Sequence, residues 1–105
     1  DGTTCPFILL GGDGVISVTS NFVPKTMAEM VHAAQAGDVT KARATHESLR
    51  ALFDVLFIES NPIPVKTALA MAGKLEENFR LPLCQISESS RSELSRVITE
   101  GGWLS

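Results

Sequence analysis

Four lysines lie in segments with helical periodicity, and lysine is the side chain that forms an imine with a carbonyl substrate: Lys25, Lys41, Lys66 and Lys74. That chemistry needs a neutral amine, which a protein obtains by desolvating the ammonium group or placing it beside another cation. A lysine on a helix surface is normally solvated, so we expect none of the four to be a nucleophile. Lys66 is the most debatable, because it follows the unusual run NPIPV.

The two histidines, His32 and His46, each lie within a predicted helix, and the carboxylates nearest to them in sequence are Glu29 and Glu47. A zinc site needs several convergent ligands that are oriented by further hydrogen bonds. Neither histidine has another His or Cys at ligand spacing, so we predict no metal site.

Cys5 and Cys84 are far apart in the sequence and belong to no CxxC or Cys/His pattern. Both lie in apolar contexts that are typical of reduced core residues, although a disulfide between them is the alternative. The sequence shows no Ser/His/Asp or Cys/His set that would indicate a nucleophilic enzyme.

Three glycines in the segment GGDGVISV, residues 11–18, resemble a phosphate-binding loop. The usual fingerprints require a helix after the loop, and the P-loop also requires Lys followed by Ser or Thr. Here an apolar strand pattern follows instead. A helix end and tight turn therefore explain these glycines better.

Composition excludes two classes of partner. The 105 residues are 44% hydrophobic and 20% charged, with a net charge of −3. Nucleic acid and anionic membranes both require a basic face, and the sequence has no cluster of Lys or Arg. No apolar run is long enough to span a bilayer, and no signal peptide is visible, so we expect a globular cytoplasmic protein.

The elements that must position any site are mostly helical. We expect a short helix over residues 3–10, capped by threonine, and a strand buried on both faces over 15–18. Apolar residues then recur at helical spacing from Pro24 to Gly37, and again from an Asp38 cap to a point before Asn61.

Two further helices are predicted near the C-terminus. Asn61 is expected to cap the third long helix, with Pro62 in its first position and Gly73 at its end. The last helix is expected to begin at Ser87 or Ser90 and to end at the glycines of residues 101–102. Ser90 with Glu93 fits a capping box.

The single predicted strand has no partner in the sequence. Its buried backbone groups would each cost about 1–3 kcal/mol if they were left unpaired. Either the strand prediction is wrong, or the neighbouring strands lie upstream of Asp1.

Three segments together resemble the C-terminal part of the 4-hydroxy-tetrahydrodipicolinate synthase (dihydrodipicolinate synthase) family: GGDGVISVTSN, ESNPIPVK, and RLPLC followed by ISE. The resemblance runs over essentially the whole chain. It implies an α/β fold, the end of a (β/α)8 TIM barrel over residues 1–36, followed by a helical C-terminal extension over 37–105. On this resemblance, residues 14–18 are the last barrel strand and the chain itself is mostly α.

The resemblance also implies a function for the parent protein. Pyruvate would form a Schiff base with a lysine, and the resulting enamine would attack aspartate semialdehyde, in the diaminopimelate route to lysine. The catalytic lysine, the proton-relaying tyrosine and the carboxylate-binding threonines would lie upstream of Asp1, and this chain has no tyrosine. We therefore expect no catalytic residue here and an inactive isolated chain.

One ligand position is implied within the chain: the main chain of Ile16, which would contact the pyruvate-derived group. Asp1 and Gly2 match a loop close to the site, and no role is assigned to them. The family resemblance implies a homotetramer and no cofactor.

Two alternatives remain open. Another member of the wider family, such as N-acetylneuraminate lyase or a sugar-acid aldolase, would use the same lysine chemistry with another acceptor. A non-catalytic helical interaction module would explain the amphipathic segments without any reaction.

Overall fold

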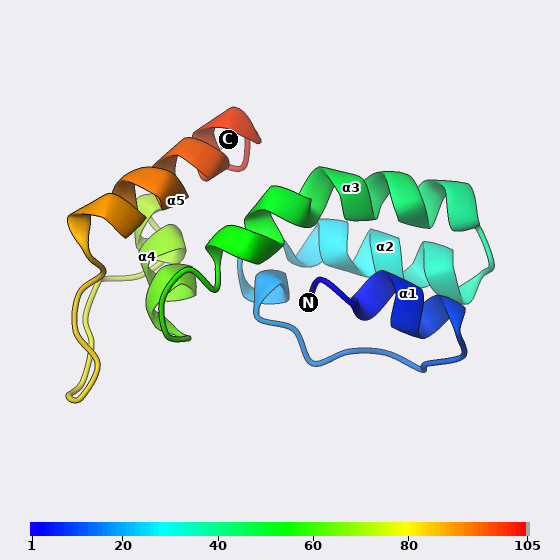
Figure 1. Ribbon diagram of the computed structural model, residues 1–105, viewed down its shortest axis with the longest axis horizontal. Helices are drawn as coiled ribbons and strands as arrows, with labels where there is room; N and C mark the ends of the chain where they lie inside the picture. The colour runs from blue at the N-terminus through cyan, green and yellow to red at the C-terminus, as the bar shows by residue number, and fades with distance from the viewer. Residues whose placement is uncertain (105) are drawn as a thin grey trace. The chain divides into compact units, whose positions relative to one another are not determined.

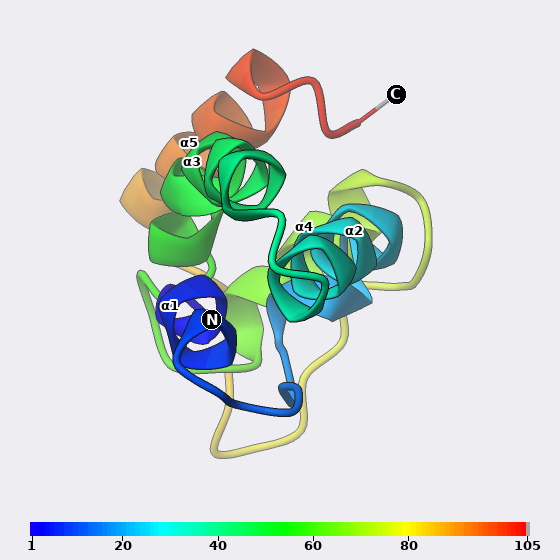
Figure 2. The same ribbon diagram turned by 90° about the vertical axis from the view of Figure 1, so that its right-hand side faces the viewer.

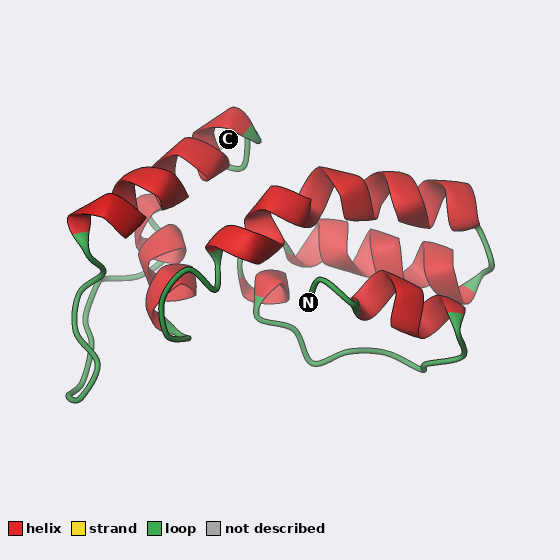
Figure 3. Cartoon of the chain, in the orientation of Figure 1, coloured by secondary structure: helices red, strands yellow, loops and turns green. Residues whose placement is uncertain are grey.

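A computed structural model describes residues 1–104, which are mostly α-helical, as predicted (Figures 1 and 3). The described elements, in chain order, are α1 (Thr4–Leu9), the 3-10 helix η1 (Thr19–Asn21), α2 (Pro24–Gln35), α3 (Val39–Val55), α4 (Ile63–Met71) and α5 (Glu88–Glu100). They form two compact units, the N-terminal unit of residues 1–53 and the C-terminal unit from Asp54 onward. None of the helices in residues 1–104 is both long and apolar enough to cross a membrane.

The predicted strand is not formed within the described chain. Residues 12–17 run as loop, and residues 1–104 contain no β-strand (Figure 3). A strand exists only through its ladder of hydrogen bonds, and nothing in the described chain pairs with this segment. Its apolar pattern remains, but Val15 and Ile16 are exposed rather than buried on two faces.

In the N-terminal unit, α1 packs against α2, and η1 packs against the same helix (Figures 1 and 2). The buried residues of α2 recur at helical spacing, as expected, and include Met27 and Met30. On α3 the predicted apolar face is confirmed by the complete burial of Ala42 and Leu49. Thr45, placed on the same face, is only half-buried.

Most helix ends follow the sequence signals. Pro24 opens α2, and Gly37, with φ of 76°, follows its end in a conformation that favours glycine. Asp38 caps α3 as predicted, because its Oδ1 accepts a hydrogen bond from the Lys41 backbone at 3.1 Å. Thr3 occupies the N-cap position of α1, as predicted, but its side chain makes no capping hydrogen bond.

Two caps in the C-terminal unit differ from prediction. The residue before α4 is Pro62, not Asn61, and the helix starts at Ile63. Two prolines, Pro62 and Pro64, suit a first turn, so the sequence did not distinguish the two starting points. Ser87 caps α5 by accepting from the Ser90 backbone at 3.3 Å. The capping box at Ser90 is therefore wrong.

The C-terminal unit is built on the packing of α4 against α5. Its completely buried apolar side chains include Leu94 and Ile98 on α5 and Ala68 on α4. Gly73, with φ of 71°, follows the end of α4 as predicted. The loop that joins the two helices is held to α5 by an ion pair between Arg91 and Glu77.

The cysteines behave differently from each other. Both are free thiols. Cys5 is buried in α1, as predicted, and burial raises the pKa of its thiol. Cys84 is exposed in the loop before α5, so its assignment to the core was wrong. The buried apolar residue of that stretch is Ile86.

Glu59 links the loop before α4 to the start of α5. Its Oε2 accepts hydrogen bonds from the Ser87 hydroxyl at 2.7 Å and the Ser87 backbone N–H at 3.1 Å. The Ser90 hydroxyl, followed by the Ser87 hydroxyl and the Ser87 backbone, lowers the pKa of the Glu59 carboxyl below its ordinary value of 4.5. These bonds favour the ionised form in the folded chain.

Glu59 should therefore make the free energy of unfolding depend on pH in the acidic range. The pKa of Glu59 is lower in the folded chain than in the unfolded chain. Its stabilising contribution is therefore complete above pH 4.5 and is lost as pH falls through the pKa of the folded chain. Glu59→Gln should make the free energy of unfolding less dependent on pH in that window, measured by urea unfolding at a series of pH values. Glu29→Gln, an exposed change on α2, controls for the loss of one charge. Equal pH dependence in wild type and Glu59→Gln would contradict the prediction.

Candidate functional site

Ile16, the one ligand position that the family resemblance implied, lies in the loop segment of residues 14–16, whose backbone is unpaired in the described chain. None of the N–H and C=O groups of these three residues has a hydrogen-bond partner among residues 1–104. The Ile16 side chain is fully exposed, at 104% of its reference area. The segment therefore presents free backbone donors and acceptors, which a ligand or another strand can use.

One anchor holds the N-terminal end of this segment. The Gln35 side-chain amide donates a hydrogen bond to the Asp13 carbonyl at 2.7 Å, which ties the turn before Gly14 to the end of α2. This bond is exposed to solvent, so it contributes a modest amount to the rigidity of the segment.

A cluster of polar side chains anchors the other end. The Ser20 hydroxyl donates to the Ser17 carbonyl at 2.9 Å, and the Ser20 backbone N–H donates to the Ser17 hydroxyl at 3.0 Å. The Asn21 amide donates to the carbonyls of Ser17 and Val18 at 3.3 and 3.1 Å. The residues directly after Ile16 are therefore fixed by side chains of η1.

Asp1 completes the second anchor. Its Oδ2 accepts hydrogen bonds from both the Thr19 hydroxyl, at 2.6 Å, and the Thr19 backbone N–H, at 2.7 Å. Thr19 is completely buried, although it is polar. A carboxylate that accepts two such bonds forms a stronger contact than neutral pairs do.

A groove of about 300 Å³ lies between this segment and α2. Its walls are mainly apolar and include Val15, Met27 and Val31, while His32 and the serines of residues 17 and 20 supply polar groups. Among residues 1–104, no lysine and no cysteine lines the groove, so those residues supply it with no nucleophile for imine or thioester chemistry.

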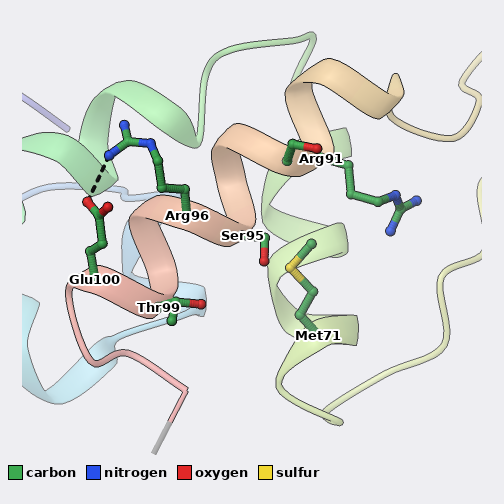
Figure 4. Close-up of a pocket in the computed structure, with 7 residues that line it drawn as sticks. Met71, Arg91, Ser95, Arg96, Thr99 and Glu100 are labelled. Atoms are coloured by element: carbon green, nitrogen blue, oxygen red, sulfur yellow. Dashed lines mark hydrogen bonds and ion pairs between the residues drawn. The ribbon is translucent and has the colours of Figure 1, made fainter.

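A larger hollow, of about 620 Å³, lies in the C-terminal unit beside α5 and is lined also by Met71 of α4 (Figure 4). Its two arginines are already paired. Arg96 turns toward Glu100, with a separation of 2.8 Å, and also binds Glu93, while Arg91 binds Glu77. Neither guanidinium is left without an anionic partner, and no predicted site residue lies here.

Lys66 is helical, as predicted, but it is half-buried rather than solvated. Its Nζ donates to the Asn78 carbonyl at 2.5 Å and lies 4.9 Å from the centre of the Phe79 ring. Both contacts engage the amine of Lys66 with groups of the same chain. Lys66 therefore fastens the loop after α4 to that helix.

The histidines do not join a metal cluster. Within residues 1–104, no three His, Cys, Asp or Glu side chains come together closely enough to hold a metal ion. His46 instead contacts the Phe53 ring, with ring centres 5.8 Å apart, and its Nδ1 is buried without a hydrogen-bond partner in the described chain.

Comparison with known proteins gives the family. The model of the dihydrodipicolinate synthetase family matches residues 1–101. The chain belongs to this family. It is 50% identical over 102 residues to the 4-hydroxy-tetrahydrodipicolinate synthase of Thermodesulfovibrio yellowstonii, a match that covers 97% of this chain and 35% of the relative. The chain thus spans about a third of the length of the curated family members that it matches.

Solved structures of family members superpose on the chain. The dihydrodipicolinate synthase of Aquifex aeolicus is 45% identical, with a TM-score of 0.94 over 97% of this chain and 35% of that one. The synthase of Acinetobacter baumannii, solved in complex with pyruvate, is 40% identical, with a TM-score of 0.93 over 96% of this chain and 35% of that one. The family resemblance inferred from the three sequence motifs is confirmed.

Sequence reasoning placed Asp1 close to the site without a role, and it missed two contributors, Thr19 and Gln35. Asp1 and Thr19 are 18 positions apart, and no sequence periodicity joins them. The one available signal was the run TSN at residues 19–21, because three polar side chains directly after an apolar segment are well suited to hydrogen-bonding the backbone there.

Proposed function

We propose that this chain is the C-terminal part of a pyruvate-dependent lyase, a 4-hydroxy-tetrahydrodipicolinate synthase that condenses pyruvate with aspartate semialdehyde. The observation that carries the proposal is the match of residues 1–101 to the family model, together with 50% identity to a curated synthase. The activity belongs to the lysine and diaminopimelate pathway, and the protein acts in the cytoplasm as a homotetramer.

The fold proposed for the parent is a (β/α)8 barrel followed by a helical extension, with the boundary between residues 36 and 37. Residues 14–18 would be the last barrel strand. The unpaired backbone of Gly14, Val15 and Ile16 supports this, since adjacent strands of a barrel would supply the missing partners.

Within this chain we assign one substrate contact, from the main chain of Ile16 to the pyruvate-derived group. The pyruvate complex of the Acinetobacter baumannii synthase shows that a family member binds this substrate. The free backbone groups of Ile16 are suited to hydrogen-bonding a carboxylate or an iminium adduct. No catalytic residue is assigned here, because the Schiff-base lysine of the parent would lie upstream.

Borohydride trapping tests the proposal. Condensation of a lysine amine with the pyruvate ketone releases water and forms an iminium, which borohydride reduces to a stable secondary amine. The full-length parent should acquire one pyruvate-derived group, which peptide mass spectrometry should locate on a lysine upstream of Asp1. The 105-residue chain, treated identically, should acquire none.

Two results would overturn the assignment. A parent that takes up no label in the presence of pyruvate would not be a Schiff-base enzyme. A stoichiometric adduct at Lys66 would place the chemistry in this chain, against the contacts of Lys66 with Asn78 and Phe79.

A further inference from the structure

We infer that Asp1 is a positioning residue for pyruvate, acting through Thr19 on the backbone of Ile16. The inference rests on the proposed function, because it assumes that Ile16 contacts the pyruvate-derived group. Asp1 itself need not touch the substrate.

The first step is the contact between Asp1 and Thr19. One carboxylate oxygen receives both the hydroxyl and the backbone N–H of a completely buried threonine, at 2.6 and 2.7 Å. Removing such an acceptor leaves two donors unpaired in a dry environment, which costs more than losing an exposed hydrogen bond. Asp1 therefore determines where Thr19 lies.

The second step runs from Thr19 to Ile16. Thr19 is the first residue of η1, and the next two residues of η1 hold Ser17 and Val18 through their side chains. Movement of Thr19 would move this turn, and with it the residues that directly follow Ile16.

The third step compares the two anchors. The anchor before Gly14, from the Gln35 amide to the Asp13 carbonyl, is a single exposed hydrogen bond between neutral groups. The contact at Asp1 is charged, doubled and partly buried. The position of the Ile16 backbone should therefore depend more on Asp1 than on Gln35.

The test uses the full-length parent enzyme and separates positioning from stability. We expect Asp1→Ala to raise the KM for pyruvate about tenfold, because a backbone contact displaced by a fraction of an ångström loses about that much binding. Asp1→Asn keeps an oxygen acceptor at the same place and should recover most of the loss. Thr19→Val removes the hydroxyl donor and keeps the N–H, so it should raise KM about threefold.

Asp38→Ala is the matched control. Asp38 also accepts a backbone N–H, at the start of α3, and it takes no part in the anchoring of residues 14–16. This variant should lower the melting temperature of the enzyme and leave the pyruvate KM unchanged. If Asp1→Ala does not fold, the pyruvate KM of Asp1→Asn and of Thr19→Val still measures the effect of the Asp1–Thr19 contact on pyruvate binding.

Four outcomes would overturn the inference. If Asp1→Ala lowers only the melting temperature, as Asp38→Ala does, Asp1 is structural. If kcat falls while the pyruvate KM does not change, Asp1 does not act on pyruvate binding. If the wild-type parent takes up no label with pyruvate and borohydride, the proposed function fails and this inference fails with it. An active wild type with an unaffected Asp1→Ala variant would contradict this inference alone.

Discussion

Replacement of Leu94 by alanine should lower the free energy of unfolding of the C-terminal unit by about 3 kcal/mol. Leu94 is completely buried on α5, the helix that packs against α4. Removal of three carbon atoms deletes their transfer free energy and leaves a cavity that the two helices can only partly close. The unit is small, so this is a large share of its stability.

Trp103 makes the measurement specific to the C-terminal unit. It is the one tryptophan of the sequence, and it lies two glycines beyond the end of α5. Urea unfolding of the 105-residue chain, followed by Trp103 fluorescence, should show the loss for Leu94→Ala. Leu81→Ala makes the same chemical change at a side chain that is 90% exposed, and it should have almost no effect. Equal losses for the two variants would contradict the packing described for α4 and α5.

The ion pair between Arg91 and Glu77 should give a coupling energy of about 1–2 kcal/mol in a double-mutant cycle. The pair is bidentate, with one of its two bonds at 3.1 Å, and the side chains are only 29% and 22% exposed. The Glu77 carboxylate raises the pKa of the Arg91 guanidinium above its ordinary value. The contact is therefore less screened by solvent than a typical surface pair.

The cycle combines Arg91→Met with Glu77→Gln and again follows Trp103 fluorescence. A second cycle on Arg96 and Glu100 provides the control, since these side chains are 52% and 64% exposed and belong to the same unit. We expect the control pair to couple by about 0.5 kcal/mol or less. A coupling at Arg91 no larger than at Arg96 would show that burial adds nothing to this contact.

Helices were the most predictable part of this chain, because their signals are local. The apolar spacing of Met27 and Met30, the cap at Asp38 and the glycine at residue 37 each act within a few residues of one another. The start of α4 was less predictable, since both Pro62 and Pro64 suit the first turn of a helix. The cap of α5 was ambiguous between Ser87 and Ser90 for a similar reason, because serine suits either position.

The predicted strand is absent from residues 1–104 for a non-local reason. The apolar residues Val15, Ile16 and Val18 carry a strand preference, but preference alone does not form a ladder. Pairing partners must come from elsewhere in space, and the described residues supply none. The same argument explains why the exposure of Ile16 could not be predicted from its hydrophobicity.

The site was predictable only in outline. The family resemblance indicated the Ile16 main chain, whereas the contact of Asp1 with Thr19 depends on a loop closing over 18 positions. The contacts of Lys66 were unpredictable for the same reason, because its partners Asn78 and Phe79 lie beyond the end of α4.

The contrast between the two thiols has a practical use. Cys84 is open to solvent, while Cys5 is enclosed in α1 and its raised pKa disfavours the reactive thiolate. A maleimide dye applied near neutral pH should attach to the loop before α5 and spare α1, so the native sequence already offers a single-site label. Paired with Trp103 as an energy donor, that label would report the opening of the C-terminal unit without any engineered cysteine.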